Sequence, residues 1–158
     1  MVATPLRLFL AGDVMTGRGV DQILQHQVEP VLYESSVSDA RTYVDLAERA
    51  NGPIPRRVDP GYIWGNALAL LDDEAPAVRI VNLETAITDR GSAWPAKGIH
   101  YRMHPANVDV LAVARIDCCS VANNHDEVEW MAGMLSWESS RFGVGVEVAG
   151  AGRIRVAG

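Results

Sequence analysis

Leu6-Arg7-Leu8-Phe9-Leu10-Ala11-Gly12-Asp13 is a strand-like apolar run that leads directly into a polar loop. The arrangement recurs where Val78-Arg79-Ile80-Val81 leads into Asn82-Leu83-Glu84, and where the run 116–122 leads into Asn123-Asn124-His125. Because the carboxyl ends of parallel strands meet at one edge of an α/β sheet, we expect these three loops to lie together. Carboxylate, amide and imidazole groups are the donors that divalent metal ions take from proteins. The pattern therefore predicts a metal site at this edge.

Helix-like segments separate the strand-like runs. We expect strands at 6–11, 78–83, 116–122 and 145–149, and helices at 20–27, 39–50, 63–71, 105–114 and 127–141. This alternation is typical of βαβ crossovers and predicts an α/β fold with a mostly parallel sheet. Residues 28–61, interrupted by Pro and Gly, are interpreted as an insertion, and 85–104 as a long loop. A length of 158 residues suits a single domain over 1–158.

Composition narrows the class of protein. With 48% apolar residues and a formal net charge of −6, the chain is typical of a soluble globular protein without a nucleic-acid partner, which would need a clustered basic face. No apolar run approaches the roughly 18 residues of a transmembrane span. The N-terminal segment lacks a signal cleavage site, so we expect a cytoplasmic protein. Adjacent strand residues point to opposite faces, which favours Cys118 and Cys119 as small buried side chains rather than a disulfide.

Each candidate metal or catalytic residue has a structural alternative. Asp13 is a candidate metal ligand, but an isolated Gly-Asp also caps turns and helices. Glu84 follows an apolar strand, where a carboxylate is costly unless it is exposed, paired or metal-bound. In Asn124-His125 the amide is a candidate ligand and the imidazole a candidate proton donor to a leaving group, although a single His is commonly structural. The recurrence of such loops at three strand ends favours a joint site.

A second group of candidates is cationic. Loop 97–104 contains Lys97, His100, Tyr101, Arg102 and His104, which suit the carboxylates or phosphates of an anionic substrate. Arg18, in the glycine-rich loop after the first strand, is a further candidate for the same substrate. The alternatives are a surface loop held together by its own Tyr and Met, and a surface arginine.

Four motifs occur in a fixed order along the chain: Gly12-Asp13-Val14-Met15-Thr16-Gly17-Arg18-Gly19, Asn82-Leu83-Glu84-Thr85-Ala86, Lys97-Gly98-Ile99-His100-Tyr101-Arg102-Met103-His104-Pro105 and Ala122-Asn123-Asn124-His125. Together they resemble the CapA family of poly-γ-glutamate capsule biosynthesis proteins, which are similar to calcineurin-like metallophosphatases. The resemblance resumes at Ala149-Gly150-Ala151-Gly152.

The resemblance implies a layered α/β sandwich around a dinuclear site for divalent ions, with Mn, Zn, Fe or Mg as candidates. In that reading Asp13, Glu84 and Asn124 match metal ligands and His125 matches the proton donor. An anionic small molecule or polymer would be the substrate, bound by Arg18, Lys97 and Arg102. Hydrolysis of a phosphoester or a γ-glutamyl polymer is the expected reaction.

The sequence differs from the family pattern in two respects. The family's later histidine motifs have no counterpart within 158 residues, so the sequence indicates the N-terminal part of the sandwich. Between Asp126 and Val144 the residues differ from the family pattern while the spacing is kept, which compensating frame shifts or relaxed constraint would produce. The alternatives to a hydrolase are thus a non-catalytic truncated remnant, completion of the site by a partner chain, and a module that binds an anionic polymer. We also expect self-association through an exposed sheet face.

Overall fold

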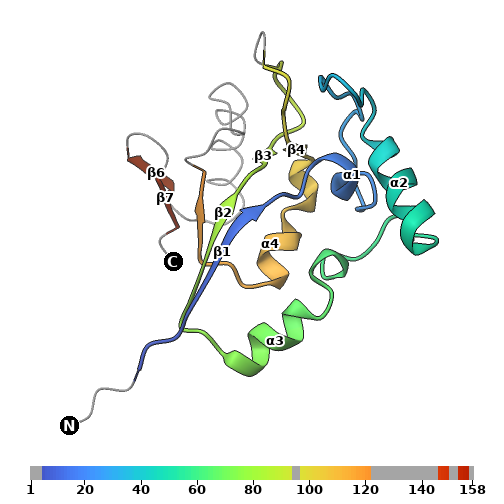
Figure 1. Cartoon of the computed structure of the whole chain (residues 1–158). Coiled ribbons are helices and arrows are strands. Elements are labelled where there is room, and N and C mark those ends of the chain that lie inside the picture. The colour runs from blue at the N-terminus through green and yellow to red at the C-terminus, as the bar shows by residue number, and fades with distance from the viewer. Residues whose placement is uncertain (1–4, 94–96, 122–145, 150–152, 157–158) are drawn as a thin grey trace.

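A five-stranded sheet in the order β1-β2-β5-β7-β6 forms the centre of the structure (Figure 1), a computed structural model that describes residues 5–93, 97–121, 146–149 and 153–156. Strands β1, β2 and β5 are parallel, whereas β7 pairs antiparallel with both β5 and β6. The strands are β1 (Leu8–Val14), β2 (Val78–Leu83), β5 (Cys118–Ser120), β6 (Val146–Ala149) and β7 (Arg153–Val156). The predicted α/β class is therefore confirmed, with an antiparallel pair added at one edge.

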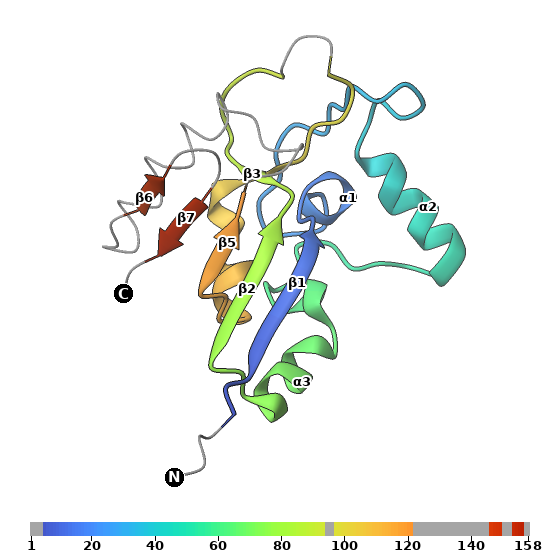
Figure 2. The ribbon, with the colours of Figure 1, turned by 60° about the vertical axis from the view of Figure 1, so that its left-hand side comes forward.

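Helices and short connecting elements surround the parallel strands. Figures 1 and 2 show α3 and α4 on one face of the sheet, and α1 and α2 beyond the carboxyl end of β1. A second, two-stranded sheet pairs β3 with β4 in parallel. The elements are α1 (Arg18–Asp21), α2 (Arg41–Asn51), the 3₁₀ turn η1 (Tyr62–Trp64), α3 (Ala67–Glu74), β3 (Ala86–Ile87), β4 (Arg102–Met103), the 3₁₀ turn η2 (Pro105–Asn107) and α4 (Asp109–Val113).

The hydrophobic core lies on the helical face of the sheet. Leu83 of β2 packs in one cluster with Val110 and Leu111 of α4 and with Met103 of β4. Alternation along β2 explains this placement, since Arg79, Val81 and Leu83 are buried while the residues between them are half-exposed. The helices therefore cover the face of β2 that carries Arg79, Val81 and Leu83.

Arg79 is a charged residue on this buried face of β2. Its guanidinium donates to the carbonyl oxygen of Ala114 at 2.6 Å and to that of Leu71 at 3.0 Å. These carbonyls lie at the C-terminal ends of α4 and α3, where helices leave acceptors without a partner and favour positive charge. Arg79 therefore joins both helices to the sheet, which is why a strand that packs in the core tolerates an arginine.

The opposite face of the sheet exposes apolar side chains. Leu8 pairs in register with Val78 and Leu10 with Ile80, so the four side chains share this face. Leu8 and Leu10 are 51% and 67% exposed. Among the described residues no helix is long and apolar enough to cross a membrane.

We propose that the purified chain self-associates through this face, because contiguous apolar strands with an exposed edge favour pairing. The double variant Leu8→Lys/Leu10→Lys is expected to reduce the fraction of dimers and larger species. Light scattering coupled to size-exclusion chromatography measures the change. Leu46→Lys, which alters an exposed leucine on α2, is the matched control and should leave the mass unchanged. Equal association of all three proteins would contradict the proposal.

Three local predictions were wrong in extent. The helix expected at 20–27 is limited to α1, because Asp21 accepts a hydrogen bond from the Val28 backbone and turns the chain away. The helix expected at 63–71 begins later, at Ala67, after η1, and the loop 85–104 contains β3 and β4. The helix expected at 127–141 lies outside the described residues.

Candidate functional site

A bulge between β1 and β2 places Asp13 at the carboxyl edge of the sheet. Ala11 pairs with Val81 and Val14 with Leu83, so two residues of β1 lie opposite the single residue Asn82. Asp13 adopts a φ of 51°, a left-handed conformation that side chains other than glycine rarely take. Bulges and strained backbone occur preferentially next to functional sites, where they redirect a side chain. The bulge and the left-handed backbone thus fix the position of Asp13 at this edge of the sheet.

Asn82 connects the two predicted carboxylate ligands. Its Nδ2 donates to Glu84 Oε1 at 2.7 Å and makes a longer contact of 3.5 Å with Asp13 Oδ1. Both carboxylates thus converge on one amide nitrogen, a polar position between two negative charges. Two convergent carboxylates offer the oxygen donors that hard and borderline divalent cations take, so the donor chemistry fits such an ion. The sequence-based expectation that Asp13 and Glu84 lie close together is confirmed.

The two loops are also fixed by their backbones. The Glu84 N–H donates to the Val14 carbonyl at 3.0 Å, and the Thr16 N–H donates to Thr85 Oγ1 at 2.9 Å. Glu84 is only 7% exposed, whereas Asp13 is exposed. The pair therefore has a buried, immobilised carboxylate and a solvent-facing one, which would let a ligand reach the site from the Asp13 side.

The third predicted loop follows β5. Ser120 of β5 pairs in register with Asn82, so β5 ends beside the Asp13–Asn82–Glu84 group. Asn124 and His125 lie outside the described residues, as does the segment 126–144. Within the described part of the chain no three His, Cys, Asp or Glu side chains are placed to hold a metal ion. The described residues thus include two of the three predicted metal ligands, Asp13 and Glu84, with the Asn82 amide between them.

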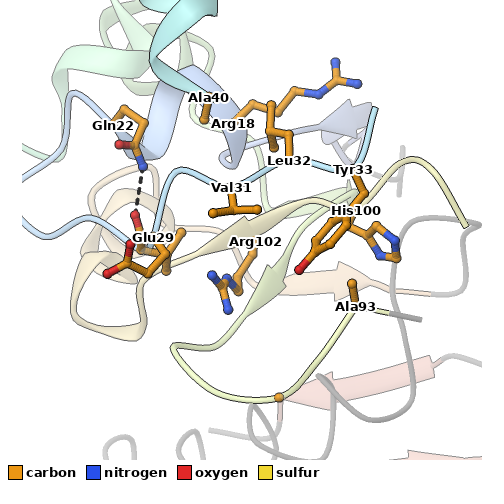
Figure 3. A pocket seen from close by; sticks show the side chains of 12 residues that line it. Arg18, Gln22, Glu29, Val31, Leu32, Tyr33, Ala40, Ala93, His100 and Arg102 are labelled. Atoms are coloured by element: carbon orange, nitrogen blue, oxygen red, sulfur yellow. Dashed lines mark hydrogen bonds between the residues drawn. The ribbon is translucent and has the colours of Figure 1, made fainter. Parts of the chain in front are cut away.

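Two of the three cationic candidates, Arg18 and Arg102, line a separate pocket (Figure 3). Arg18, His100 and Arg102 line it together with Tyr33, and Figure 3 shows the Arg18 and Arg102 side chains pointing away from each other. Lys97 is not among the described residues that line this pocket; its carbonyl oxygen lies 2.6 Å from His100 Nε2. The structure therefore brings two of the three predicted substrate-binding residues to one pocket wall, with their charges directed differently.

The segment 28–40 forms the other wall of this pocket and supplies a partner to Arg18. Glu34 Oε1 lies 2.7 Å from Arg18 Nε, and the other carboxylate oxygen accepts a hydrogen bond from the Tyr43 hydroxyl. That hydrogen bond, the largest contribution, raises the pKa of Tyr43. The sequence assigned no functional role to Glu34 or Tyr43, because neither belongs to a motif.

A buried carboxylate, Asp21, joins the insertion to the core. Its oxygens accept hydrogen bonds from the backbone N–H groups of Val28 at 2.8 Å and His104 at 2.9 Å, and from Asn107 Nδ2 at 3.2 Å. Burial raises the pKa of Asp21, and these hydrogen bonds offset only part of that effect. Asp21 was also missed, although an aspartate between apolar helix positions is a signal for a buried polar centre.

The histidines of loop 97–104 have structural contacts. His100 is buried and contacts the Tyr33 ring edge-on at 5.3 Å, and its Nε2 is hydrogen-bonded within its own loop. His104 stacks on His26 at 5.5 Å and its Nδ1 accepts the Ala106 N–H at the start of η2. These two histidines therefore shape the loop around the pocket.

Comparison with known proteins agrees with the motifs. The model of the bacterial capsule synthesis protein family PGA_cap matches residues 7–154. The chain belongs to this CapA family. A probable polyglutamine synthesis accessory protein of Mycobacterium tuberculosis strain CDC 1551 / Oshkosh is 46% identical over 145 residues, as is a protein of the same description from strain H37Rv.

These relatives are considerably longer than the chain. The match covers 92% of the CapA-family chain and 38% of each mycobacterial relative. No solved structure matches the chain significantly. Membership of the family is thus shown over nearly the whole chain, and the relatives contain sequence beyond it.

Proposed function

We propose that this CapA-family chain carries part of a divalent-metal site that hydrolyses an anionic substrate, of γ-glutamyl polymer or phosphoester type, in capsule biosynthesis. The observation that supports the proposal most is the convergence of Asp13 and Glu84 on Asn82 Nδ2 at a strained bulge. A cation in this position would replace the amide hydrogen as the positive partner of both carboxylates. Mn²⁺, Zn²⁺, Fe²⁺ and Mg²⁺ are the candidate ions.

The residues have distinct proposed roles. Asp13, Glu84 and Asn124 hold the metal, and His125 donates a proton to the leaving group. When bound, a divalent ion of this kind lowers the pKa of a coordinated water and stabilises negative charge on the substrate. Arg18, Lys97 and Arg102 attract and orient the anionic substrate through charge-assisted hydrogen bonds.

A second candidate function is polymer binding without turnover. It is favoured by the pocket of Arg18, His100 and Arg102, which is formed by residues other than the proposed metal ligands. In that case the chain recognises carboxylates of a γ-glutamyl polymer, and the Asp13–Glu84 pair is a remnant of a hydrolytic site.

Measurements of metal binding and of turnover distinguish the two candidate functions. Purified chain with Mn²⁺ or Zn²⁺ is expected to show a raised thermal midpoint, because an ion that binds only the folded state stabilises it. Hydrolysis is then assayed with a phosphodiester and with poly-γ-glutamate. Glu84→Gln should lose both the midpoint shift and turnover, whereas His125→Ala should keep the shift and lose turnover by about 10²- to 10⁴-fold.

Asp59→Asn is the matched control, since Asp59 is an exposed carboxylate outside both candidate sites. It should behave like the unmodified chain in every assay. Polymer binding with neither metal response nor turnover would favour the second candidate. A midpoint and activity that ignore metal, together with no binding of the polymer, would contradict both.

A further inference from the structure

The guanidinium of Arg18 is enclosed by two aromatic rings and a carboxylate. Its Cζ lies 4.4 Å from the centroid of the Tyr101 ring and 5.0 Å from that of Tyr43. Glu34 completes the enclosure at 2.7 Å, with the side chains of Arg18 and Glu34 only 19% and 10% exposed. Partial burial strengthens both the cation–π contacts and the ion pair relative to a surface arginine. We call Arg18, Tyr43, Tyr101 and Glu34 the arginine cage.

The glycines beside Arg18 allow the cage to form. A Cβ at Gly17 would lie 2.9 Å from the Arg102 backbone nitrogen and 3.3 Å from Tyr101 Cβ, and one at Gly19 would lie 3.0 Å from Tyr43 Cβ. The two tyrosine-bearing segments therefore approach Arg18 from opposite flanks only because neither neighbour has a side chain. Arg18 itself has a φ of 50°. The motif Gly17-Arg18-Gly19 thus encodes a preorganised position for a cation, at some cost in backbone strain.

Glu34 reaches the cage from a short reversal of the chain. Leu32 N–H donates to the Ser38 carbonyl at 2.9 Å, and Ala40 N–H donates to the Pro30 carbonyl at 2.7 Å. Glu34 lies within the turn that these bonds close. Its contact with Arg18 Nε is an ion pair without hydrogen-bond alignment, which is a less favourable geometry than a guanidinium and a carboxylate can achieve. Among the described residues Glu34 is the only anionic partner of Arg18.

The enclosed pair lies at the wall of the pocket. Arg18 lines the pocket with Arg102 and His100, and Leu32 and Tyr33, which precede Glu34 directly, line it as well (Figure 3). Arg18 is also only five residues from Asp13 along the same loop. A guanidinium between two tyrosines, with a tyrosine hydroxyl on the second carboxylate oxygen, is an arrangement suited to a ligand carboxylate.

We propose that the arginine cage is a carboxylate-binding site that the protein fills internally with Glu34, and that a ligand carboxylate of glutamate type replaces Glu34 when it binds. The side chain of Glu34 has the same carboxylate chemistry as a glutamate unit of a ligand, so exchange requires no new type of contact. Displacement of Glu34 would release the turn 32–38 from the core and open the pocket wall. The identity of the ligand as a γ-glutamyl chain rests on the proposed function, whereas the carboxylate site does not.

The test is chemical rescue of a variant that lacks the internal carboxylate. Glu34→Ala is compared in sodium propionate and in sodium chloride of equal concentration, with the thermal midpoint as readout. At about 100 mM propionate we expect the midpoint of Glu34→Ala to rise by about 3–6 °C over chloride, because a ligand at tenfold its dissociation constant stabilises the folded state appreciably. The unmodified chain should respond less, since Glu34 competes. Arg18→Met/Glu34→Ala should not respond to propionate.

Further variants keep the outcome decisive. If Glu34→Ala does not fold, Glu34→Gln retains the shape of the cage and is titrated with propionate by the NMR signal of the Arg18 Nε–H group, which should shift on binding. Glu29→Gln, which removes another carboxylate from the same pocket wall, is the matched control and should respond like the unmodified chain. An equal propionate response of Glu34→Ala and Arg18→Met/Glu34→Ala, or no shift of the Arg18 signal, would overturn the proposal.

The polymer distinguishes this inference from the proposed function. Poly-γ-glutamate should bind Glu34→Gln about 10-fold more tightly than the unmodified chain, because removal of a competing internal charge lowers the cost of opening the cage. Rescue by propionate without any binding of the polymer would leave the carboxylate site in place and contradict the γ-glutamyl ligand. Binding of the polymer without rescue would contradict the internal role of Glu34.

Discussion

Replacing Asp13 with glycine is expected to stabilise the fold and to abolish its response to divalent metal in the same molecule. Asp13 has a φ of 51°, a conformation that costs most L-residues about 1–2 kcal/mol, costs Asp and Asn less, and costs glycine almost nothing. The substitution also removes one of two carboxylates that share Asn82 Nδ2. Against these gains stands the larger unfolded-state entropy of glycine, about 0.5–1 kcal/mol. The net gain should be about 0.5–1 kcal/mol.

The loss of function in Asp13→Gly should be far larger than the gain in stability. Removal of a direct carboxylate ligand is expected to weaken Mn²⁺ binding at least about 100-fold, since even indirect partners of metal ligands contribute 10- to 100-fold. Urea unfolding with and without Mn²⁺ measures both effects in one experiment. A residue that lowers stability in the absence of its ligand is expected where backbone strain positions a functional group.

Two variants separate backbone strain from charge. Asp13→Asn keeps a side chain that tolerates the left-handed region, so its stability should stay near that of the unmodified chain while the Mn²⁺ response is lost. Asp13→Ala retains the strain and should be less stable than Asp13→Gly. Retention of the Mn²⁺ response in Asp13→Gly would show that Asp13 is not a ligand. If Asp13→Gly is less stable than Asp13→Ala, the backbone at residue 13 is not strained.

The sequence predicted those elements whose pattern is local and long enough to read. Strand β2 has the predicted bounds, 78–83, because a run rich in Val, Ile and Leu follows directly on the break at Pro76. Strand β1 continues three residues past the predicted end at Ala11, since the bulge at Asp13 allows pairing to resume at Val14. The two-residue strands β3 and β4 have no readable period, and the hydrogen bonds between them depend on a loop closing over about fifteen residues. Strand β7 was not predicted.

In the candidate site, too, some contacts could be predicted from the sequence and others could not. The nearness of Asp13 and Glu84 followed from a general rule, that parallel strands bring their carboxyl ends to one edge. The pairing of Arg18 with Glu34 could not follow from any such rule, because the insertion reaches the pocket through a turn without periodicity. Contacts set by sheet topology are thus predictable from sequence, whereas contacts made by irregular segments depend on the three-dimensional packing that places them.

Asp21→Asn is expected to lower the free energy of unfolding by about 2–4 kcal/mol at neutral pH. The carboxylate of Asp21 accepts hydrogen bonds from two backbone N–H groups and from Asn107, and a further contact of 3.3 Å comes from Gln22. An asparagine keeps the shape but turns an N–H₂ group toward donors, so at least one buried donor loses its acceptor. Because Asp21 joins α1 to the start of the insertion and to η2, the loss should also loosen the segment beside the arginine cage.

The pH dependence of Asp21 gives this prediction a second readout. Burial raises the pKa of Asp21 above its ordinary value of 3.8, so between pH 3.8 and the raised pKa the folded chain holds a proton that the unfolded chain has released. The contribution of Asp21 to the free energy of unfolding therefore falls as the pH rises through that window and is constant above it. The asparagine of Asp21→Asn does not titrate. The free energy of unfolding of this variant should therefore fall furthest below that of the unmodified chain at acidic pH, and the difference should be smaller above the window. Urea unfolding across this pH range, with Asp59→Asn as an exposed control, measures the deficit; a deficit that grows as pH rises would mean that the hydrogen bonds to the carboxylate outweigh the effect of burial.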